Sequence, residues 1–205
     1  MRGGGHQGHN QARQQEPAEK RKLTVMLRDY DTETNHCNGI NHLVVAGGAP
    51  AGQTTLFTAG RDRLIKLWHA DYEAMQSPST SDKAVSLIAD LDGHIDWVNQ
   101  LVHIDSVNTL ISCSNDTTIK LWRLKTLERY QRNNAKIRSA NQGQQVYRQS
   151  AFSTLYDHSD YVRCIDYAAA GRLFSAADAG KIFQWDLHVE KIAQKYENFD
   201  QFGNI

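Results

Sequence analysis

The chain has 205 residues, of which 22% are charged and 40% are hydrophobic, and its formal net charge at pH 7 is zero. No apolar run approaches the roughly 18 residues of a membrane-spanning helix, and the polar N-terminus rich in glycine and glutamine does not resemble a signal peptide. The three cysteines, Cys37, Cys113 and Cys164, lie far apart, which favours small buried residues in a reducing compartment over a disulfide framework or a zinc site.

The first segment, 1–21, is expected to be a disordered tail, because it is polar and rich in glycine and glutamine. His6 and His9 form an H-x-x-H pair in this tail, but no other ligand-type residues accompany them, so we expect no metal site. The next segment, 22–35, begins with K-L-T-V-M-L-R-D-Y, which predicts a strand.

Three repeats follow, and one phrase identifies them. It reads L-F-T-A-G-R-D-R-L-I-K-L-W at 56–68, L-I-S-C-S-N-D-T-T-I-K-L-W at 110–122 and L-F-S-A-A-D-A-G-K-I-F-Q-W at 173–185. Alternation of apolar and polar residues, β-branched residues and polar turns predict short antiparallel strands. The repeats span 36–91, 92–155 and 156–197, each ending in an outer strand (84–91, 151–155 and 191–196), and 198–205 is a short end.

Loops interrupt the first two repeats at 47–53, at 70–82 and at 123–150. The core of the last loop, 128–150, is a basic insertion. It could contact nucleic acid or an acidic partner through charge attraction, or it could be a solvated flexible insertion. The loop 123–150 carries a single acid, Glu128, against these basic residues: Arg123, Lys125, Arg129, Arg132, Lys136, Arg138 and Arg148.

Four side chains of the second repeat are predicted to form a hydrogen-bonded relay. The indole of Trp122 reaches the hydroxyl of Ser112, the hydroxyl reaches the imidazole of His94, and the imidazole reaches the carboxylate of Asp116. Such a set satisfies its own donors and acceptors, as buried polar groups require. Because the set recurs from repeat to repeat, we interpret it as structural and not as a catalytic triad, and we predict no enzyme.

The other two repeats contain similar sets. His36 lies as far before Asn41 as His94 lies before Asn99, which gives a first relay. In the third repeat Ala179 aligns with Asp116, and Asp178 comes one position early. Either the D-A-G turn re-aims Asp178 toward the imidazole, or this repeat has lost its carboxylate. The predicted first set is His36, Thr58, Asp62 and Trp68, and the third set is His158, Ser175, Asp178 and Trp185.

Candidate binding residues lie in the loops that contain the relay histidines, which we call the histidine loops, and in the turns at the relay aspartate positions, which we call the Asp turns. Aromatic residues and arginines are the usual anchors of protein interfaces, although Trp97 and Tyr161 could instead pack between repeats. We predict that the partner-binding residues come from this set: Arg61, Arg63, Asp96, Trp97, Asp160 and Tyr161.

These repeats resemble those of WD-repeat β-propeller proteins. N-G-I-N, L-F-T-A-G-R-D, H-I-D-W-V-N and H-S-D-Y-V, in this order after a strand like K-L-T-V-M-L-R-D, resemble the N-terminal blades of the WD-repeat activators of ubiquitin-specific proteases. The resemblance covers roughly 22–190. It implies a ring of seven or eight blades, but at about 40–45 residues per blade the sequence holds only three. We therefore expect an all-β fold of about three four-stranded antiparallel blades in an incomplete propeller, an open arc in which 22–35 is the closing strand of a full ring.

The resemblance also implies a function. We expect a non-catalytic scaffold that binds and activates ubiquitin-specific proteases, located in the nucleus and the cytoplasm. A generic protein-assembly scaffold without an enzyme partner and a nucleic-acid-binding arc acting through the basic insertion are the alternatives. We expect no cofactor, no small-molecule substrate and no membrane span.

Overall fold

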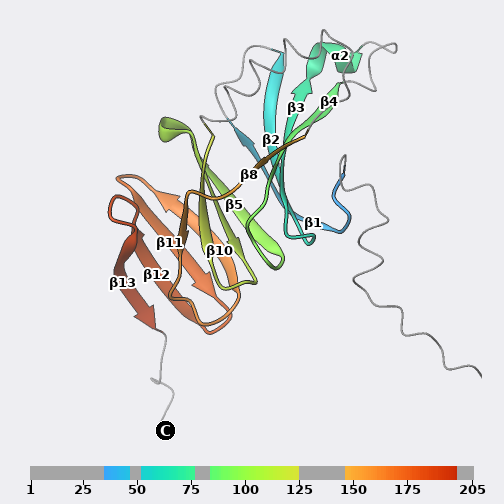
Figure 1. Ribbon diagram of the computed structural model, residues 1–205. Coiled ribbons are helices and arrows are strands. Elements are labelled where there is room, and N and C mark those ends of the chain that lie inside the picture. The colour runs from blue at the N-terminus through green and yellow to red at the C-terminus, as the bar shows by residue number, and fades with distance from the viewer. Residues whose placement is uncertain (1–34, 47–51, 77–83, 125–145, 198–205) are drawn as a thin grey trace, which may run out of the picture. The chain divides into compact units, whose positions relative to one another are not determined.

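The computed structural model describes residues 35–46, 52–76, 84–124 and 146–197 (Figure 1). The chain divides into two units, Met1–Tyr30 and Asp31–Ile205, and every described residue belongs to the second unit. The expectations for the tail 1–21, for nearly all of the strand 22–35, for most of the insertion 128–150 and for the end 198–205 therefore concern residues outside the described part.

The first sheet is built by consecutive strands of the first repeat. β1 (Ile40–Ala46), β2 (Gln53–Gly60), β3 (Ile65–Asp71) and β4 (Val85–Leu91) pair in this order and antiparallel. A short helix, α2 (Tyr72–Gln76), lies between β3 and β4, where the sequence predicted a loop.

The second and third sheets repeat this arrangement. β5 (Val98–Ile104), β6 (Thr109–Ser114), β7 (Ile119–Arg123) and β9 (Ser153–Leu155) form the second sheet, with a 3-10 turn, η2 (Asp105–Val107), after β5. β10 (Val162–Ala168), β11 (Arg172–Ala177), β12 (Lys181–Asp186) and β13 (Lys191–Glu197) form the third sheet. The predicted fold class, all-β with three antiparallel blades that do not close into a ring, is confirmed.

One strand departs from the expected four-stranded blades. β8 (Tyr147–Gln149), at the end of the basic insertion, pairs parallel with β4 and gives the first sheet a fifth strand. Parallel pairing requires a long connection, and the whole of β5, β6 and β7 separates β4 from β8. Our prediction that this segment is only loop is wrong, because the outer edge of β4 offers unpaired backbone groups that a short segment can pair with.

Two hydrophobic cores join the three sheets. The first core contains Phe57 and Leu67 of the first sheet and Leu101 and Trp122 of the second. The second core joins the opposite face of the second sheet to the third sheet through residues that include Ile111 and Phe183. Strand β6 is buried on both faces for this reason, and alternate residues of one strand belong to different cores.

Candidate functional site: buried relays and an arginine–aromatic surface

The relay of the second sheet is complete. Trp122 Nε1 donates to Ser112 Oγ over 2.9 Å, Ser112 Oγ lies 2.7 Å from His94 Nε2, and His94 Nδ1 lies 2.7 Å from Asp116 Oδ2. Since the carboxylate only accepts, the imidazole carries its proton on Nδ1 and accepts the hydroxyl proton at Nε2. Every member of the relay thus has a partner.

Asp116 also connects the histidine loop to the turn between β6 and β7. Its carboxylate accepts hydrogen bonds from the backbone N–H of Ile95 and from the N–H and hydroxyl of Thr118. Burial acts to raise the pKa of Asp116, but His94 and these other donors outweigh it and hold that pKa well below its usual range. Burial lowers the pKa of His94 against the opposing effect of Asp116. The relay is therefore a neutral imidazole beside a carboxylate.

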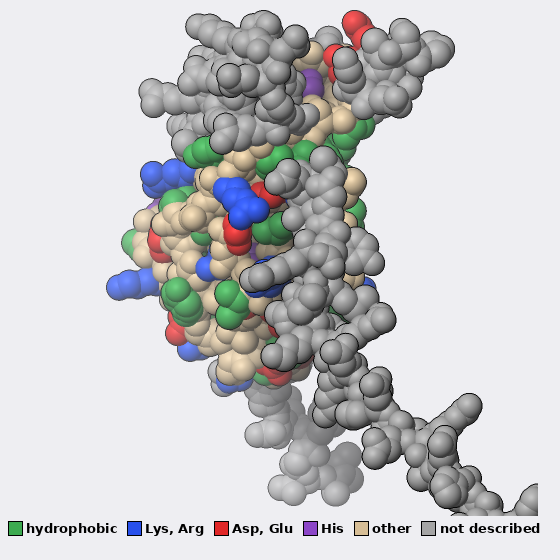
Figure 2. Space-filling model, turned by 45° about the vertical axis from the view of Figure 1, so that its right-hand side comes forward, with side chains coloured by type: hydrophobic (Ala, Val, Ile, Leu, Met, Phe, Trp, Pro, Cys, Tyr) green, Lys and Arg blue, Asp and Glu red, His purple; other side chains and the backbone are tan. Residues whose placement is uncertain are grey.

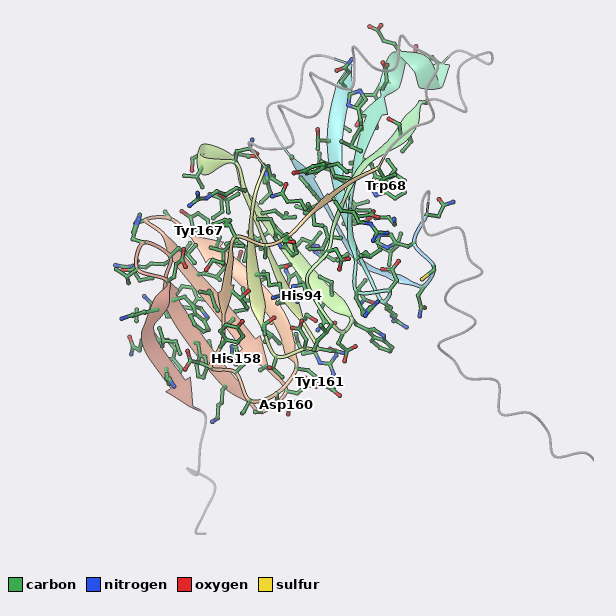
Figure 3. The ribbon with its side chains drawn as sticks, viewed as in Figure 1. Trp68, His94, His158, Asp160, Tyr161 and Tyr167 are labelled. Atoms are coloured by element: carbon green, nitrogen blue, oxygen red, sulfur yellow. The ribbon has the colours of Figure 1, made fainter. Side chains whose placement is uncertain are left out.

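The first sheet builds the same relay with threonine in place of serine. His36 Nδ1 lies 2.8 Å from Asp62 Oδ2, His36 Nε2 lies 2.7 Å from Thr58 Oγ1, and Trp68 Nε1 donates to the same hydroxyl over 2.8 Å. Asp62 likewise accepts from the N–H groups of Cys37 and Leu64. Figure 3 shows Trp68, His94 and His158 in successive parts of the fold.

The relay of the third sheet has no carboxylate. His158 Nε2 and Trp185 Nε1 each lie 2.7 Å from Ser175 Oγ, but the buried His158 Nδ1 has no hydrogen-bond partner among the described residues. Asp178 points away and pairs with Arg163. Including Asp178 in the relay was wrong. In the aligned repeats, Asp178 corresponds to Asn115 of the second sheet and to Arg61 of the first. The side chains of these two residues also contact the innermost strand of their own sheet.

The sequence analysis missed a set of residues on the innermost strands. Each of β1, β5 and β10 has a register shift at the same place, around Asn41, Asn99 and Arg163. A β-bulge re-aims the side chain at such a point. Asn41 Nδ2 donates to the carbonyl of Val98 over 2.9 Å, and Asn99 Nδ2 donates to that of Val162 over 2.7 Å. These asparagines therefore join each sheet to the next.

The repeated asparagine after the histidine was the signal for this role. Arg61 Nε donates to Asn41 Oδ1, and Asn99 Nδ2 donates to Asn115 Oδ1. At the same place in the third sheet, Arg163 forms an ion pair with Asp178. The repeated asparagine can be seen in the sequence once the repeats are aligned. Its role in joining one sheet to the next follows only from the β-bulge, which the structure shows.

Arginine and aromatic side chains meet on the surface beside the Asp turns. The guanidinium of Arg61 lies over the ring of Trp97, 4.9 Å from its centroid, and that of Arg163 lies over Tyr161 at 5.2 Å. Asn115 connects the two pairs, since its N–H donates to the carbonyl of Trp97 and its side chain accepts from Arg163.

The predicted partner-binding residues lie on or beside this surface. Trp97 is 40% exposed and Tyr161 is 42% exposed, so neither is a core residue between repeats. Arg61 and Arg63 are both exposed. Asp96 and Asp160 are half-buried, and each accepts a hydrogen bond from the N–H of the aromatic residue that follows it; Figure 3 shows Asp160 and Tyr161 together. We call Arg61, Arg63, Trp97, Tyr161 and Arg163 the arginine–aromatic surface.

The relays do not offer a reaction site. Ser112 and Ser175 are buried, and each hydroxyl is occupied by an indole and an imidazole. In the described ranges, no group of three or more His, Cys, Asp or Glu side chains is arranged to hold a metal ion, and no helix is long and apolar enough to cross a membrane. All three cysteines are free thiols.

Comparison with known proteins agrees with this geometry. Residues 85–123 and 149–186 match the family model described as WD domain, G-beta repeat. Each matched segment begins near the outer strand of one sheet and ends on the third strand of the next, so a sequence repeat bridges two sheets.

Among solved structures, the chain is similar to the WD40 β-propeller domain of Doa1, at 21% sequence identity and a TM-score of 0.47. The match covers 74% of this chain and 38% of that one, so this chain spans well under half of the structure that it matches. Two segments of this chain thus match WD40 repeats, and the part of the chain that the structure describes consists mainly of β-strands.

Proposed function

We propose that this chain is a non-catalytic protein-binding scaffold whose binding site is the arginine–aromatic surface. The observation that carries the proposal is the exposed Arg61–Trp97 contact, which joins side chains of two successive sheets. Trp, Tyr and Arg dominate the binding energy of protein interfaces. Stacked arginines are also partly preorganised, so they lose less side-chain entropy when a partner binds.

The relays support this role by making the surface rigid. Asp62 and Asp116 bind the backbone of the histidine loops and of the Asp turns, and these loops and turns carry Arg61, Arg63 and Trp97. Figure 2 shows Lys/Arg and Asp/Glu side chains interspersed on the face in view.

The partner in this proposal is a ubiquitin-specific protease, which the scaffold activates. The support is the order of motifs in the first two repeats, which resembles the protease-activating WD-repeat proteins. Activation without added catalytic groups requires that the scaffold bind the competent conformation of the protease more tightly than the incompetent one.

A binding and turnover experiment tests both parts of the proposal, that the chain binds a ubiquitin-specific protease and that it activates this protease. Purified chain is titrated into catalytic domains of ubiquitin-specific proteases, and both the dissociation constant and the hydrolysis of a fluorogenic ubiquitin substrate are measured. We expect at least one protease to bind and to turn over faster. Trp97→Ala and Arg61→Glu should weaken binding at least tenfold. Arg172→Glu should not, because Arg172 lies at the start of β11, at the end of that strand away from the turn to β12.

The outcomes separate the two candidates. Faster turnover that is lost in Trp97→Ala supports protease activation. Binding without faster turnover supports only a scaffold, and absence of binding across the protease panel contradicts the proposed partner. If Arg172→Glu weakens binding as much as Arg61→Glu does, the surface has been assigned wrongly.

A further inference from the structure

Arg61 is held in place by three neighbouring residues. Its Nε donates to Asn41 Oδ1 over 2.8 Å, and its guanidinium lies over the ring of Trp97, 4.9 Å from the centroid. Its stem passes beside Gly39, where an added Cβ would lie 3.5 Å from Cδ of Arg61. These contacts restrain an otherwise flexible side chain, although Arg61 remains exposed. Its guanidinium is therefore oriented before any partner binds.

The contacts of Arg61 leave one edge of its guanidinium available. A guanidinium has five N–H donors in one plane, and stacking on a ring covers a face of that plane without using a donor. Among the described residues, only the Nε–H of Arg61 is engaged, by Asn41. The N–H groups of the two terminal nitrogens have the geometry that a carboxylate accepts in two parallel hydrogen bonds. Arg61 thus presents an oriented fork of donors at the surface.

The third sheet shows how a guanidinium on this surface is bound. Arg163 Nε and Nη2 donate to the two carboxylate oxygens of Asp178, over 2.7 Å and 2.5 Å. In the aligned repeats Asp178 stands at the position of Arg61, so the same position carries a carboxylate in one sheet and a guanidinium in another. The charge of Arg163 is neutralised within the chain, whereas no carboxylate among the described residues forms an ion pair with Arg61.

Positive charge and apolar surface adjoin at Arg61. Arg63, two residues further along the same turn, is exposed and adds a second positive charge. In the neighbouring histidine loop, Trp97 is 40% exposed and Ile95 is 77% exposed. Asp96, between them, is half-buried and accepts a hydrogen bond from the N–H of Trp97. A segment that complements this surface carries an acidic side chain next to an apolar one.

We propose that Arg61 binds a carboxylate of the partner, so that the arginine–aromatic surface recognises an acidic protein segment in which an aspartate or a glutamate lies beside an apolar residue. This inference rests on the proposed function, because it names the chemistry that the same surface recognises. The partner's carboxylate accepts two hydrogen bonds from the terminal nitrogens of Arg61, and its apolar neighbour packs on Trp97 and Ile95. Charge-assisted, bidentate contacts of this kind are stronger and more specific in geometry than neutral hydrogen bonds.

Fluorescence anisotropy with the whole 205-residue chain tests this inference. The first probe is a labelled peptide of repeating Glu, Leu and Gly residues, and the second is its twin with Gln in place of Glu. A twin with phosphoserine in place of Glu and a single-stranded oligonucleotide represent the other anionic ligands. We expect the Glu peptide to bind more tightly than the Gln peptide by about tenfold, and its dissociation constant to rise with ionic strength.

Variants of the chain assign this preference to one side chain. Arg61→Gln should remove the preference for the Glu peptide. Arg61→Lys, which keeps the charge but loses the planar fork, should retain only part of it. Arg172→Gln removes the same charge from an exposed residue outside the surface and should bind both peptides as the wild type does. Circular dichroism of the variants shows that they remain folded.

The outcomes separate this inference from the proposed function. A preference for the Glu peptide that is lost in Arg61→Gln and kept in Arg172→Gln supports the inference. Equal binding of the Glu and Gln peptides overturns it, and so does tighter binding of the phosphoserine peptide or of the oligonucleotide. If such a result accompanies protease binding that Trp97→Ala abolishes, the surface is still the binding site and only the carboxylate assignment has failed. A preference for the Glu peptide without binding of any protease supports the inference and contradicts the proposed partner.

Discussion

The three imidazoles of the relays lie in different surroundings, although the strands around them share one register. In the first two sheets the histidine bonds to an aspartate. In the third it stacks on Phe183, with ring centroids 4.2 Å apart and planes 13° apart. Phe183 occupies the strand position of Lys66 and Lys120. Loss of the carboxylate and replacement of the lysine by a phenylalanine thus occur together around His158.

Ala179→Asp is expected to restore the third relay. The new carboxylate would lie where Asp116 lies in the second sheet and would accept a hydrogen bond from His158 Nδ1. We expect the free energy of unfolding to increase by about 1–2 kcal/mol and the pKa of His158 to rise, measured by urea denaturation and by NMR titration. Ala179→Asn offers an uncharged acceptor and should give a smaller increase in both. An unchanged stability in Ala179→Asp would show that the turn does not aim this position at the imidazole.

A buried ion pair also distinguishes the first sheet from the second. Lys66 Nζ lies 2.8 Å from Asp90 Oδ1, and both side chains are almost fully buried. At the matching place, Lys120 Nζ bonds to the neutral Thr154. Removal of one member of a buried pair leaves the other charge desolvated, which costs about 3–5 kcal/mol, whereas replacement of both by apolar residues is often nearly neutral.

The corresponding prediction concerns a double-mutant cycle. Lys66→Met and Asp90→Leu should each lower the free energy of unfolding by about 3 kcal/mol, and the double variant should lose much less than the sum of the two. Guanidinium denaturation of the four proteins measures the coupling. Additive losses would mean that the two charges do not depend on each other.

At the scale of the element, the turns between the second and third strands of each sheet share an unusual backbone. The residue after the aspartate position has a positive φ in all three sheets: 74° at Arg63, 68° at Thr117 and 72° at Gly180. This conformation costs L-residues about 1–2 kcal/mol, and β-branched residues are particularly unsuited to it. The hydrogen bonds to Asp62 and Asp116 hold the two non-glycine turns in place.

Gly180→Ala is expected to destabilise the third sheet. A Cβ at this position would meet no atom within 4 Å, so the whole cost comes from the backbone, and we expect a loss of about 1 kcal/mol in thermal or urea denaturation. Gly180→Asn should cost less, because asparagine tolerates the left-handed region better. Equal stability of Gly180→Ala and the wild type would contradict the assigned turn geometry.

The elements differ in how well the sequence predicts them. The central strands and the relays of the first two sheets could be predicted, because their residues recur at fixed spacing and because Trp, Ser or Thr, His and Asp form a self-satisfying set. Strand β8 could not be predicted, since three residues carry no period and their pairing depends on the free edge of β4. The direction of Asp178 depends on the bulge at Arg163, which leaves no local mark in the sequence.

At the scale of the whole molecule, the sheets are joined so that they depend on one another. Each of the two segments that match the WD domain model contributes an outer strand of one sheet and the next three strands of the following sheet. The second sheet is covered on both faces. Unfolding of one sheet therefore exposes the core of its neighbour, and we expect the described sheets to lose their structure in one cooperative transition.

The acid sensitivity of that transition follows from the histidines. Burial lowers the pKa of His158 to about 4, from the usual value near 6.5. The charges of Lys181 and Lys195 act in the same direction, and the charge of Asp157 opposes them. Burial lowers the pKa of His94 in the same direction. Below about pH 6.5 the unfolded chain binds protons that the folded chain does not, so the free energy of unfolding falls as the pH falls toward 4.

The stability is therefore expected to be highest above pH 6.5 and to decrease in two stages on acidification. The first stage, between about pH 6.5 and 4, comes from the histidines and has a slope of at most about 1.4 kcal/mol per pH unit for each group. The second stage, below about pH 4, comes from Asp62 and Asp116. Their pKa values are lowered in the folded chain, so on acidification the unfolded chain binds protons at a higher pH than the folded chain does. Urea denaturation from pH 3 to 8 measures both stages. His158→Gln, which cannot titrate, should flatten the first stage and leave the second unchanged, whereas a wild-type stability that stays constant between pH 7 and 5 would contradict the neutral state assigned to the buried imidazoles.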